Sequence, residues 1–595
     1  MKTEYRVFQD HPTMDWRLVA DRHVNSHLPQ TFFASREEVD ARREELRFGL
    51  RMSAGLYPWP EKTPLNVRRE VVGMYEGYSV EKIMFETVPG FWATGNLYLP
   101  HPLPEKSPAI LYFMGHFDPQ RLTRESRTDV PQQLANFARM GFICLVTDMI
   151  GKVDSRQISH DYGREEKELW LSNGLGIQLW NNIRALDLLC EMPEVDVQRI
   201  GATGCSGGGT QTLTLCLVDE RIKAAAPINM ISLEMQGGCQ CENAPGLRIH
   251  TDNCELCAML APMPLFLAGS TGDWTRNLDT VEYPMLRAAY SLYGAEENVE
   301  RFYQVAGHQY NARTRRLVYS FFARRLMGKD PDWEEQPVEV EDLQALTWFA
   351  GNGHAPGVEG DAAFFEAHKQ ELIRRVAPLG KEEKKKMLAW ITGIRDFELF
   401  TAEGTFFEKD GVTLEHNVAV THAGVQLPFI RLIPANWDHK RVCLALSGEG
   451  KDCVDREAVQ QMLADGAVVI SGDLFMLGEF ADRERKIEGG PQGERYYTTF
   501  HYTVDAYRTQ DIALLWKAAG QTGTELTLWA EGQAARAAAC ALPLLNGVKR
   551  AWLEKSALAL EGDAAYHEQF HVPGIMLLGG MKGCLQLANC AVETF

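Results

Sequence analysis

The feature that most constrains the fold of this chain is an alternation of short apolar runs with helical patterns. Between residues 80 and 330 the apolar runs read as strands, and the stretches between them have the periodicity of amphipathic helices. Examples are "PAILYFMG", "GFICLVTDMIG" and "RIGATG" for strands, and "LGIQLWNNIRALDLLCEM" for a helix. Strands that alternate with helices predict parallel βαβ units. We therefore predict an α/β fold with a doubly wound, mostly parallel sheet.

The same alternation returns between residues 400 and 595, at a nearly constant offset of about 325 positions. Asp473 in "ADGAVVISGD" stands opposite Asp148 in "ARMGFICLVTD". A constant offset through several elements indicates a duplicated fold. By this register the sequence stops where the second copy's counterpart of the strand "PLFLAGS" should begin, so we expect that copy to be truncated.

A chain of 595 residues is too long for one hydrophobic core, so several domains are expected. The repeat and the changes in charge along the chain divide it into four parts. We predict an N-terminal helical segment (residues 1–75), a catalytic domain (76–331), a helical linker (332–400) and a degenerate second copy (401–595).

The stretch "IGATGCSGGGTQT", residues 200–212, carries the strongest chemical signal. It contains G-x-S-x-G around Ser206, after an apolar run and before a helix-compatible run. This pattern is typical of a strained strand-to-helix turn that exposes a nucleophilic serine. The position opposite Ser206 in the second copy is Gly532, so we expect the second copy to lack a nucleophile.

A serine nucleophile needs a histidine base that a carboxylate orients. His308 directly follows the predicted strand "ERFYQVAG", and Asp273 follows the predicted strand "PLFLAGS". We predict Ser206, Asp273 and His308 as the catalytic triad, with Glu242 as the alternative acid. His250 is a weaker candidate for the base, because no clear strand precedes it.

An oxyanion hole requires backbone N–H groups aimed at the charge that develops on the carbonyl oxygen. We expect one such group from Gly207, at the start of the helix after the serine. The other is expected from the loop after "AILYFMG", at His116 or Phe117. The His116 side chain could instead contact substrate, or it could be an ordinary polar loop residue.

These residues resemble the α/β-hydrolase superfamily, and within it the acetyl xylan esterase-like branch related to dienelactone hydrolases. The resemblance rests on "GCSGGGTQT", "INMISLEMQGGCQCENAPGLR", "GSTGDW" and "AGHQYN". It implies hydrolysis of carboxylic esters, often of acetylated sugars, through an acyl-enzyme and without a cofactor. Tandem members of that branch have a degenerate second hydrolase domain, which is what the resemblance implies for residues 401–595.

Two other functions stay open. A serine peptidase of the prolyl oligopeptidase type shares the fold and the triad order, although no propeller-like run of short strands precedes the catalytic domain here. A non-catalytic scaffold built from two hydrolase folds is the alternative from another class. The Cys205-Ser206 pair in the strand-to-helix turn also resembles the turn of glucuronoyl methylesterases. Their turn continues with two basic residues, where this sequence has glycines.

Four cysteines lie close together in the sequence, at Cys239, Cys241, Cys254 and Cys257. Four thiolates can hold a structural zinc ion, but the spacing of the first pair is unusual for such a site. Leu587 stands opposite Cys257 in the second copy, which favours a place in the core. We therefore predict buried free cysteines, no metal and no cofactor.

The composition limits the partners. The formal net charge is −19, which disfavours nucleic acid and anionic membranes as partners. The N-terminus lacks the apolar core of a signal peptide, and no apolar run is long enough to span a bilayer. We expect a cytoplasmic protein with reduced thiols that acts on a small-molecule ester and can form a homo-oligomer.

Overall fold

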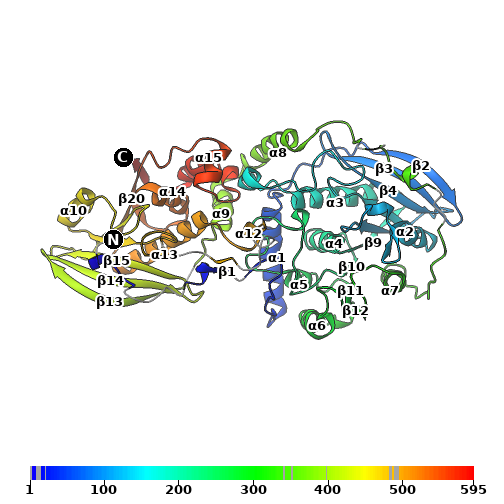
Figure 1. Cartoon of the computed structure of the whole chain (residues 1–595), viewed down its shortest axis with the longest axis horizontal. Helices are drawn as coiled ribbons and strands as arrows, with labels where there is room; N and C mark the ends of the chain where they lie inside the picture. The colour runs from blue at the N-terminus through cyan, green and yellow to red at the C-terminus, as the bar shows by residue number, and fades with distance from the viewer. Residues whose placement is uncertain are drawn as a thin grey trace.

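The computed structural model describes residues 3–8, 15–20, 22–338, 342–349, 351, 353–396, 398–481, 486–487 and 495–595. Two large twisted sheets lie at opposite ends of the long axis, each flanked by helices (Figure 1). Within the described residues the first sheet has the strand order β12-β11-β10-β9-β5-β8-β4-β3-β2. The second has the order β13-β14-β15-β17-β16-β19-β20-β21. The predicted α/β class is confirmed.

The first sheet is antiparallel at one edge and parallel from β8 to β12. Its parallel strands β5, β8, β10 and β11 are buried along their whole length, as expected where helices cover both faces. Its strands are β2 (Arg68–Tyr75), β3 (Tyr78–Val88), β4 (Phe91–Pro100), β5 (Ser107–Phe113), β8 (Ile143–Thr147), β9 (Val195–Cys205), β10 (Ala224–Ile228), β11 (Leu265–Ser270) and β12 (Val299–Gln304).

The helices beside the first sheet follow the predicted alternation. They are α2 (Val130–Arg139), α3 (Gly174–Glu191), α4 (Gly207–Val218), α5 (Asn253–Ala258), α6 (Tyr283–Ser291) and α7 (Ala312–Phe322). The N-terminal segment predicted as helical contains α1 (Arg36–Ser53), whose N-cap Ser35 accepts a hydrogen bond from the Glu38 amide. The sheet itself begins at Arg68, inside the segment predicted as helical.

The second sheet repeats the order of the first. Read from β21 to β13, its strands take the places of β11, β10, β9, β5, β8, β4, β3 and β2 in turn. They are β13 (Leu399–Lys409), β14 (Val412–Thr421), β15 (Gln426–Pro434), β16 (Arg441–Leu446), β17 (Val468–Gly472), β19 (Glu525–Ala530), β20 (Val548–Leu553) and β21 (Ala591–Thr594). The strand that we expected to be missing is therefore present in short form as β21.

The helices around the second sheet are again interleaved with the strands. They are α10 (Arg456–Ala464), α13 (Val504–Thr522), α14 (Gly532–Ala541), α15 (Gly562–Gln569) and α16 (Gly580–Leu587). The helix α14 occupies the place of α4, since it follows β19 as α4 follows β9. Its first residue, Gly532, has a φ of 56°, close to the 61° of Ser206.

A buried charge cluster also recurs at the same place in both halves. Arg121 lies 3.0 Å from Asp148 and 2.5 Å from Asp154, and all three side chains are buried. In the second half Lys451 pairs with Asp473 and Glu479, whose sequence spacing equals that of the first pair of carboxylates. Equal strand order, an equal turn and an equal charge cluster are what a duplication would leave. The duplication itself stays a prediction.

The predicted linker packs against both halves. Its helices α8 (Asp361–Val376) and α9 (Lys381–Thr392) contribute side chains to one hydrophobic cluster that includes Phe91 of the first half and Leu515 of the second. The helices α1, α9 and α12 (Tyr497–Phe500) lie between the two sheets (Figure 1). None of the helices in the described ranges combines the length and apolar character that a membrane span needs.

Candidate active site

The predicted nucleophile lies at the tight turn between β9 and α4. Ser206 has φ 61° and ψ −125°, an uncommon conformation for a residue with a side chain. Its amide donates a hydrogen bond to the carbonyl of Ile228, 3.0 Å away. A Cβ atom added at Gly204 or Gly208 would lie 2.4 or 2.2 Å from the carbonyl oxygen of Phe113, so only glycine fits on either side of the turn. The turn therefore holds Ser206 at the carboxyl edge of the parallel strands.

The predicted base and acid meet at the same edge of the sheet. His308 follows β12, Asp273 follows β11, and the His308 Nδ1 atom lies 2.9 Å from Asp273 Oδ2. A carboxylate only accepts hydrogen bonds, so Nδ1 carries the proton and Nε2 is left as an acceptor in the neutral ring. Within the described residues, His308 Nε2 is buried and has no hydrogen-bond partner.

The Asp273 carboxylate is held by several donors besides His308. Asn229 Nδ2 donates from 2.6 Å, the Thr275 amide from 2.8 Å and the Thr275 hydroxyl from 2.5 Å. Burial alone would raise the pKa of Asp273, but the hydrogen bonds from His308, Thr275 and Asn229 outweigh burial and hold that pKa below its ordinary value. Asp273 is therefore a fixed anion that can stabilise a protonated imidazole.

Two aromatic rings pack against the imidazole of His308. The ring of Trp274 lies 4.4 Å from it between centroids, and Phe117 stacks on it at 5.8 Å. No role was predicted from the sequence for Trp274, Thr275 or Asn229. Their positions directly after a predicted strand were the available signal, because carboxyl ends of parallel strands meet at one edge.

The alternative acid and the alternative base lie elsewhere. Glu242 is buried and accepts a hydrogen bond from the Thr210 hydroxyl at 2.8 Å. His250 packs against Tyr502, with ring centroids 5.9 Å apart. Burial and nearby arginines lower the pKa of His250 to about 3. Of the two predicted acids, only Asp273 is hydrogen-bonded to His308.

The predicted oxyanion groups border Ser206. Gly207 is the first residue of α4, so its N–H has no acceptor within the helix. A Cβ atom at Gly115 would lie 3.2 Å from Ser206 Cβ, which places the loop after β5 directly beside the nucleophile. Within that loop Phe117 contacts His308, and the His116 ring lies over Gly207, with its Cε1 2.7 Å from where a Cβ of Gly207 would be.

The four cysteines that were predicted to be buried and free lie in two separate places. Cys254 and Cys257 belong to α5 and are fully buried in the hydrophobic core of the first half. Cys239 and Cys241 lie instead with His116 and His160, and one ligand atom of each residue lies within 4.8 Å of the others. The sequence indicated a possible set of four thiols but not this mixed set, because His160 lies in a long loop without a recognisable pattern.

The two thiols of this mixed set have opposite proton affinities. The hydrogen bond with Cys241 lowers the pKa of Cys239 well below its ordinary value, burial opposes this, and hydrogen bonds from His116 and His160 add to the lowering. The hydrogen bond with Cys239, together with burial, raises the pKa of Cys241. In this arrangement Cys239 loses its proton more readily than Cys241 does.

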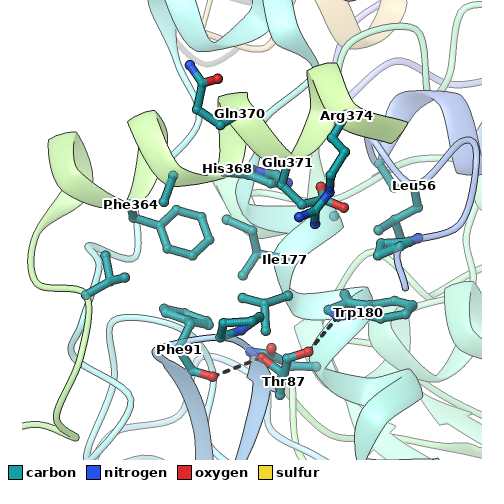
Figure 2. A pocket seen from close by; sticks show the side chains of 18 residues that line it. Leu56, Thr87, Phe91, Ile177, Trp180, Phe364, His368, Gln370, Glu371 and Arg374 are labelled. Carbon is teal, nitrogen blue, oxygen red and sulfur yellow. Dashed lines mark hydrogen bonds between the residues drawn. The ribbon is translucent and has the colours of Figure 1, made fainter. Parts of the chain in front are cut away.

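A separate cavity of about 410 Å³ lies where α8 covers the first half. Figure 2 shows its mostly apolar lining, which includes Phe91, Ile177 and Phe364, while Trp180 donates a hydrogen bond to the Thr87 carbonyl at 3.0 Å. Ser206, Asp273 and His308 do not line it. The cavity thus lies between the first half and α8, and the predicted chemistry is located elsewhere.

Comparison with known proteins agrees with the geometry of the first half. Residues 73–231 match the model of the acetyl xylan esterase family, AXE1. The matched stretch runs from β2 to the loop after β10, so it contains Ser206 and ends before Asp273 and His308. The predicted α/β-hydrolase resemblance is confirmed on these residues, and so is the predicted class, a carboxylic ester hydrolase.

Three of the similar solved structures are named as esterases. Methylesterase BT1017 is 29% identical with a TM-score of 0.49, covering 58% of this chain and 78% of its own. A glucuronoyl esterase from Solibacter usitatus is 15% identical with a TM-score of 0.39, covering 49% of this chain and 94% of its own. An acetyl xylan esterase from Paenibacillus sp. R4 is 16% identical with a TM-score of 0.32, covering 50% and 97%. No curated protein matches the sequence.

Proposed function

We propose that the chain hydrolyses carboxylic esters through a covalent acyl-enzyme formed on Ser206. The observation that carries the proposal is the meeting of two features at one sheet edge. Ser206 sits in a positive-φ turn between a strand and a helix, and a His308–Asp273 pair at 2.9 Å follows the neighbouring strands β12 and β11. This order along the chain, serine then acid then histidine, is that of α/β-hydrolases.

In the proposed reaction the Ser206 hydroxyl attacks the ester carbonyl. His308 Nε2 takes the hydroxyl proton and passes it to the leaving alcohol, and a water molecule then hydrolyses the acyl-enzyme by the same route in reverse. Asp273 keeps the proton on Nδ1 and stabilises the imidazolium. The N–H groups of Gly207 and of the loop at His116 or Phe117 stabilise the tetrahedral oxyanion.

The proposed substrates are small esters, with acetyl groups on sugars as the first class to test. The family match of residues 73–231 supports acetyl esters. The rings of the buried Phe117 and the partly buried Trp274 beside His308 make an apolar surface that suits an acyl group. A cytoplasmic location and the absence of nucleic-acid or membrane partners stay predictions.

The test is labelling with a fluorophosphonate probe, followed by turnover of a panel of esters and peptides. We expect stoichiometric labelling of Ser206 and hydrolysis of short acyl esters, with peptides untouched. Cleavage of peptides in preference to esters would favour the peptidase of the same fold. Absence of labelling in folded protein would favour the non-catalytic scaffold. Ser291→Ala, an exposed serine on α6, is the matched control and should label fully.

A further inference from the structure

Four side chains with metal-binding atoms converge beside the nucleophile, and the proposed ester hydrolysis uses none of them. They come from three separate loops: His116 after β5, His160 between β8 and α3, and Cys239 with Cys241 between β10 and α5. His116 Nε2 lies 3.2 Å from His160 Nε2 and 3.4 Å from Cys241 Sγ. Cys239 Sγ lies 3.2 Å from His160 Nε2.

The tautomer of His160 is fixed by its other ring nitrogen. His160 Nδ1 lies 2.7 Å from the Ile150 carbonyl oxygen, which can only accept. The proton of the neutral ring is therefore on Nδ1, and the lone pair of Nε2 points toward His116 and Cys239. A histidine that ligates a metal commonly shows this arrangement, with its second nitrogen donating to a backbone carbonyl.

We propose that His116, His160, Cys239 and Cys241 bind one zinc ion in a tetrahedral site. Bond lengths of about 2.0–2.1 Å to nitrogen and about 2.3 Å to sulfur put tetrahedral ligands roughly 3.3 to 3.8 Å apart. The observed separations of 3.2, 3.2 and 3.4 Å are close to those ligand–ligand distances. Two imidazoles and two thiolates are a ligand set that zinc prefers.

With four protein ligands the proposed site is closed, so we assign it a structural role. It joins the loop that carries His116 to the loop that carries Cys239 and Cys241. The His116 ring packs on Gly207, whose amide is a predicted oxyanion donor. On this point the inference rests on the proposed function: the ion fixes the position of the oxyanion groups and does not contact the ester.

The surroundings of Cys239 and Cys241 differ from those of Cys254 and Cys257. Cys254 and Cys257 are enclosed by apolar core residues, where a free thiol packs as a small hydrophobic group. Cys239 is only partly buried, and His116 is exposed, so an ion can reach the site from solvent. The loop that carries Cys239 and Cys241 is also fixed by Gln240, whose side-chain oxygen accepts a hydrogen bond from Arg164 Nε at 3.2 Å.

The experiment measures metal in the full-length protein, purified without chelators, by mass spectrometry of the elements. We expect about one zinc ion per chain, falling below roughly a tenth in Cys239→Ser, Cys241→Ser and His160→Gln. Cys453→Ser removes an exposed thiol outside the set and should keep the metal. Ser206→Ala should also keep it, so failure of the proposed catalysis and failure of the metal site are distinguishable.

A second measurement covers variants that do not fold. Wild-type protein stripped of metal and loaded with cobalt(II) should show the thiolate-to-metal and visible absorption bands of a tetrahedral thiolate site. Wild-type protein that holds no zinc after dialysis against it, or cobalt-loaded protein without thiolate bands, would overturn the proposal. Full zinc content in Cys239→Ser, or a disulfide between Cys239 and Cys241 in the unreduced protein, would overturn it equally.

Discussion

At the scale of single residues, the proposed reaction depends on the hydroxyl of Ser206. Ser206→Ala removes the nucleophile, and because alanine adds no bulk the turn should keep its geometry. Triad enzymes lose on the order of 10³-fold or more in kcat on such a change. We expect that loss in ester turnover at saturating substrate, with an unchanged melting temperature. A variant that keeps near-wild-type turnover would disprove the assignment of the nucleophile.

The two candidate acids give a second residue-scale prediction. Asp273→Asn leaves a group that can donate to His308 Nδ1, which favours the wrong tautomer and costs roughly 10⁴-fold in the well-studied serine protease case. Glu242→Gln keeps an acceptor for the Thr210 hydroxyl and does not touch His308, so its effect should be far smaller. Comparing kcat/KM of the two variants checks this ranking. A larger loss in Glu242→Gln would show that Glu242 is the acid.

At the scale of elements, the sequence was a good guide where burial makes strands uniformly apolar. The strands β5, β8 and β11 were predictable because helices cover both of their faces, which leaves them apolar along their whole length. By contrast β2 was not predicted, because this edge strand alternates little and most of its residues are exposed. An exposed strand has no apolar face to reveal it in a sequence.

The residues of the candidate site also differ in how well the sequence predicts their positions. Ser206, Asp273 and His308 were predictable because each directly follows a strand, and parallel strands end at a common edge. The set of His116, His160, Cys239 and Cys241 was not, since it is assembled from three loops whose paths follow no simple periodicity. Cys239 and Cys241 were noted as a pair, but their histidine partners come from more than 70 positions earlier in the chain.

The strand-to-helix turn yields a prediction about an element. Gly208 lies where a Cβ atom would be 2.2 Å from the Phe113 carbonyl oxygen, so α4 cannot approach β5 as closely in Gly208→Ala. The helix must shift, which costs several kcal/mol and misplaces Ser206. We expect poor expression and loss of probe labelling. Gly238→Ala is the control, because a Cβ there meets nothing within 4 Å, and it should label normally.

At the scale of the whole molecule, the second half supports the site of the first. Tyr496 donates a hydrogen bond to the carbonyl of Gly238 at 3.0 Å. Gly238 directly precedes Cys239, in the loop that follows β10. The Gly246 and Arg248 amides donate to the carbonyls of Thr498 and Thr499 at 2.7 and 2.8 Å. The loop that carries Cys239, Cys241 and Glu242 is therefore positioned by residues from the half that has Gly532 in place of a nucleophile.

This dependence leads to a prediction about the separated halves. A chain cut after residue 335 loses α8, α9 and the second sheet, and it bares apolar side chains such as Phe91 and Leu171 that are now buried. Exposed apolar surface of this kind promotes aggregation. We expect residues 1–335 to be less soluble and to melt lower than the full chain, while any folded fraction still labels at Ser206.

Residues 400–595 provide the complementary experiment. At the equivalent turn Gly532 has the positive φ that Ser206 has, but no side chain. The Gly532 amide donates a hydrogen bond to Glu554 at 2.7 Å, and Glu554 directly follows β20 as Asn229 follows β10. The buried Lys451, which pairs with two carboxylates, corresponds to Arg121 in the first half, and such a buried ion pair has a structural role. This half should therefore never react with a fluorophosphonate. If the isolated second half labels at a serine and turns over an ester, it contains its own active site, and its role as a support for the first half is wrong.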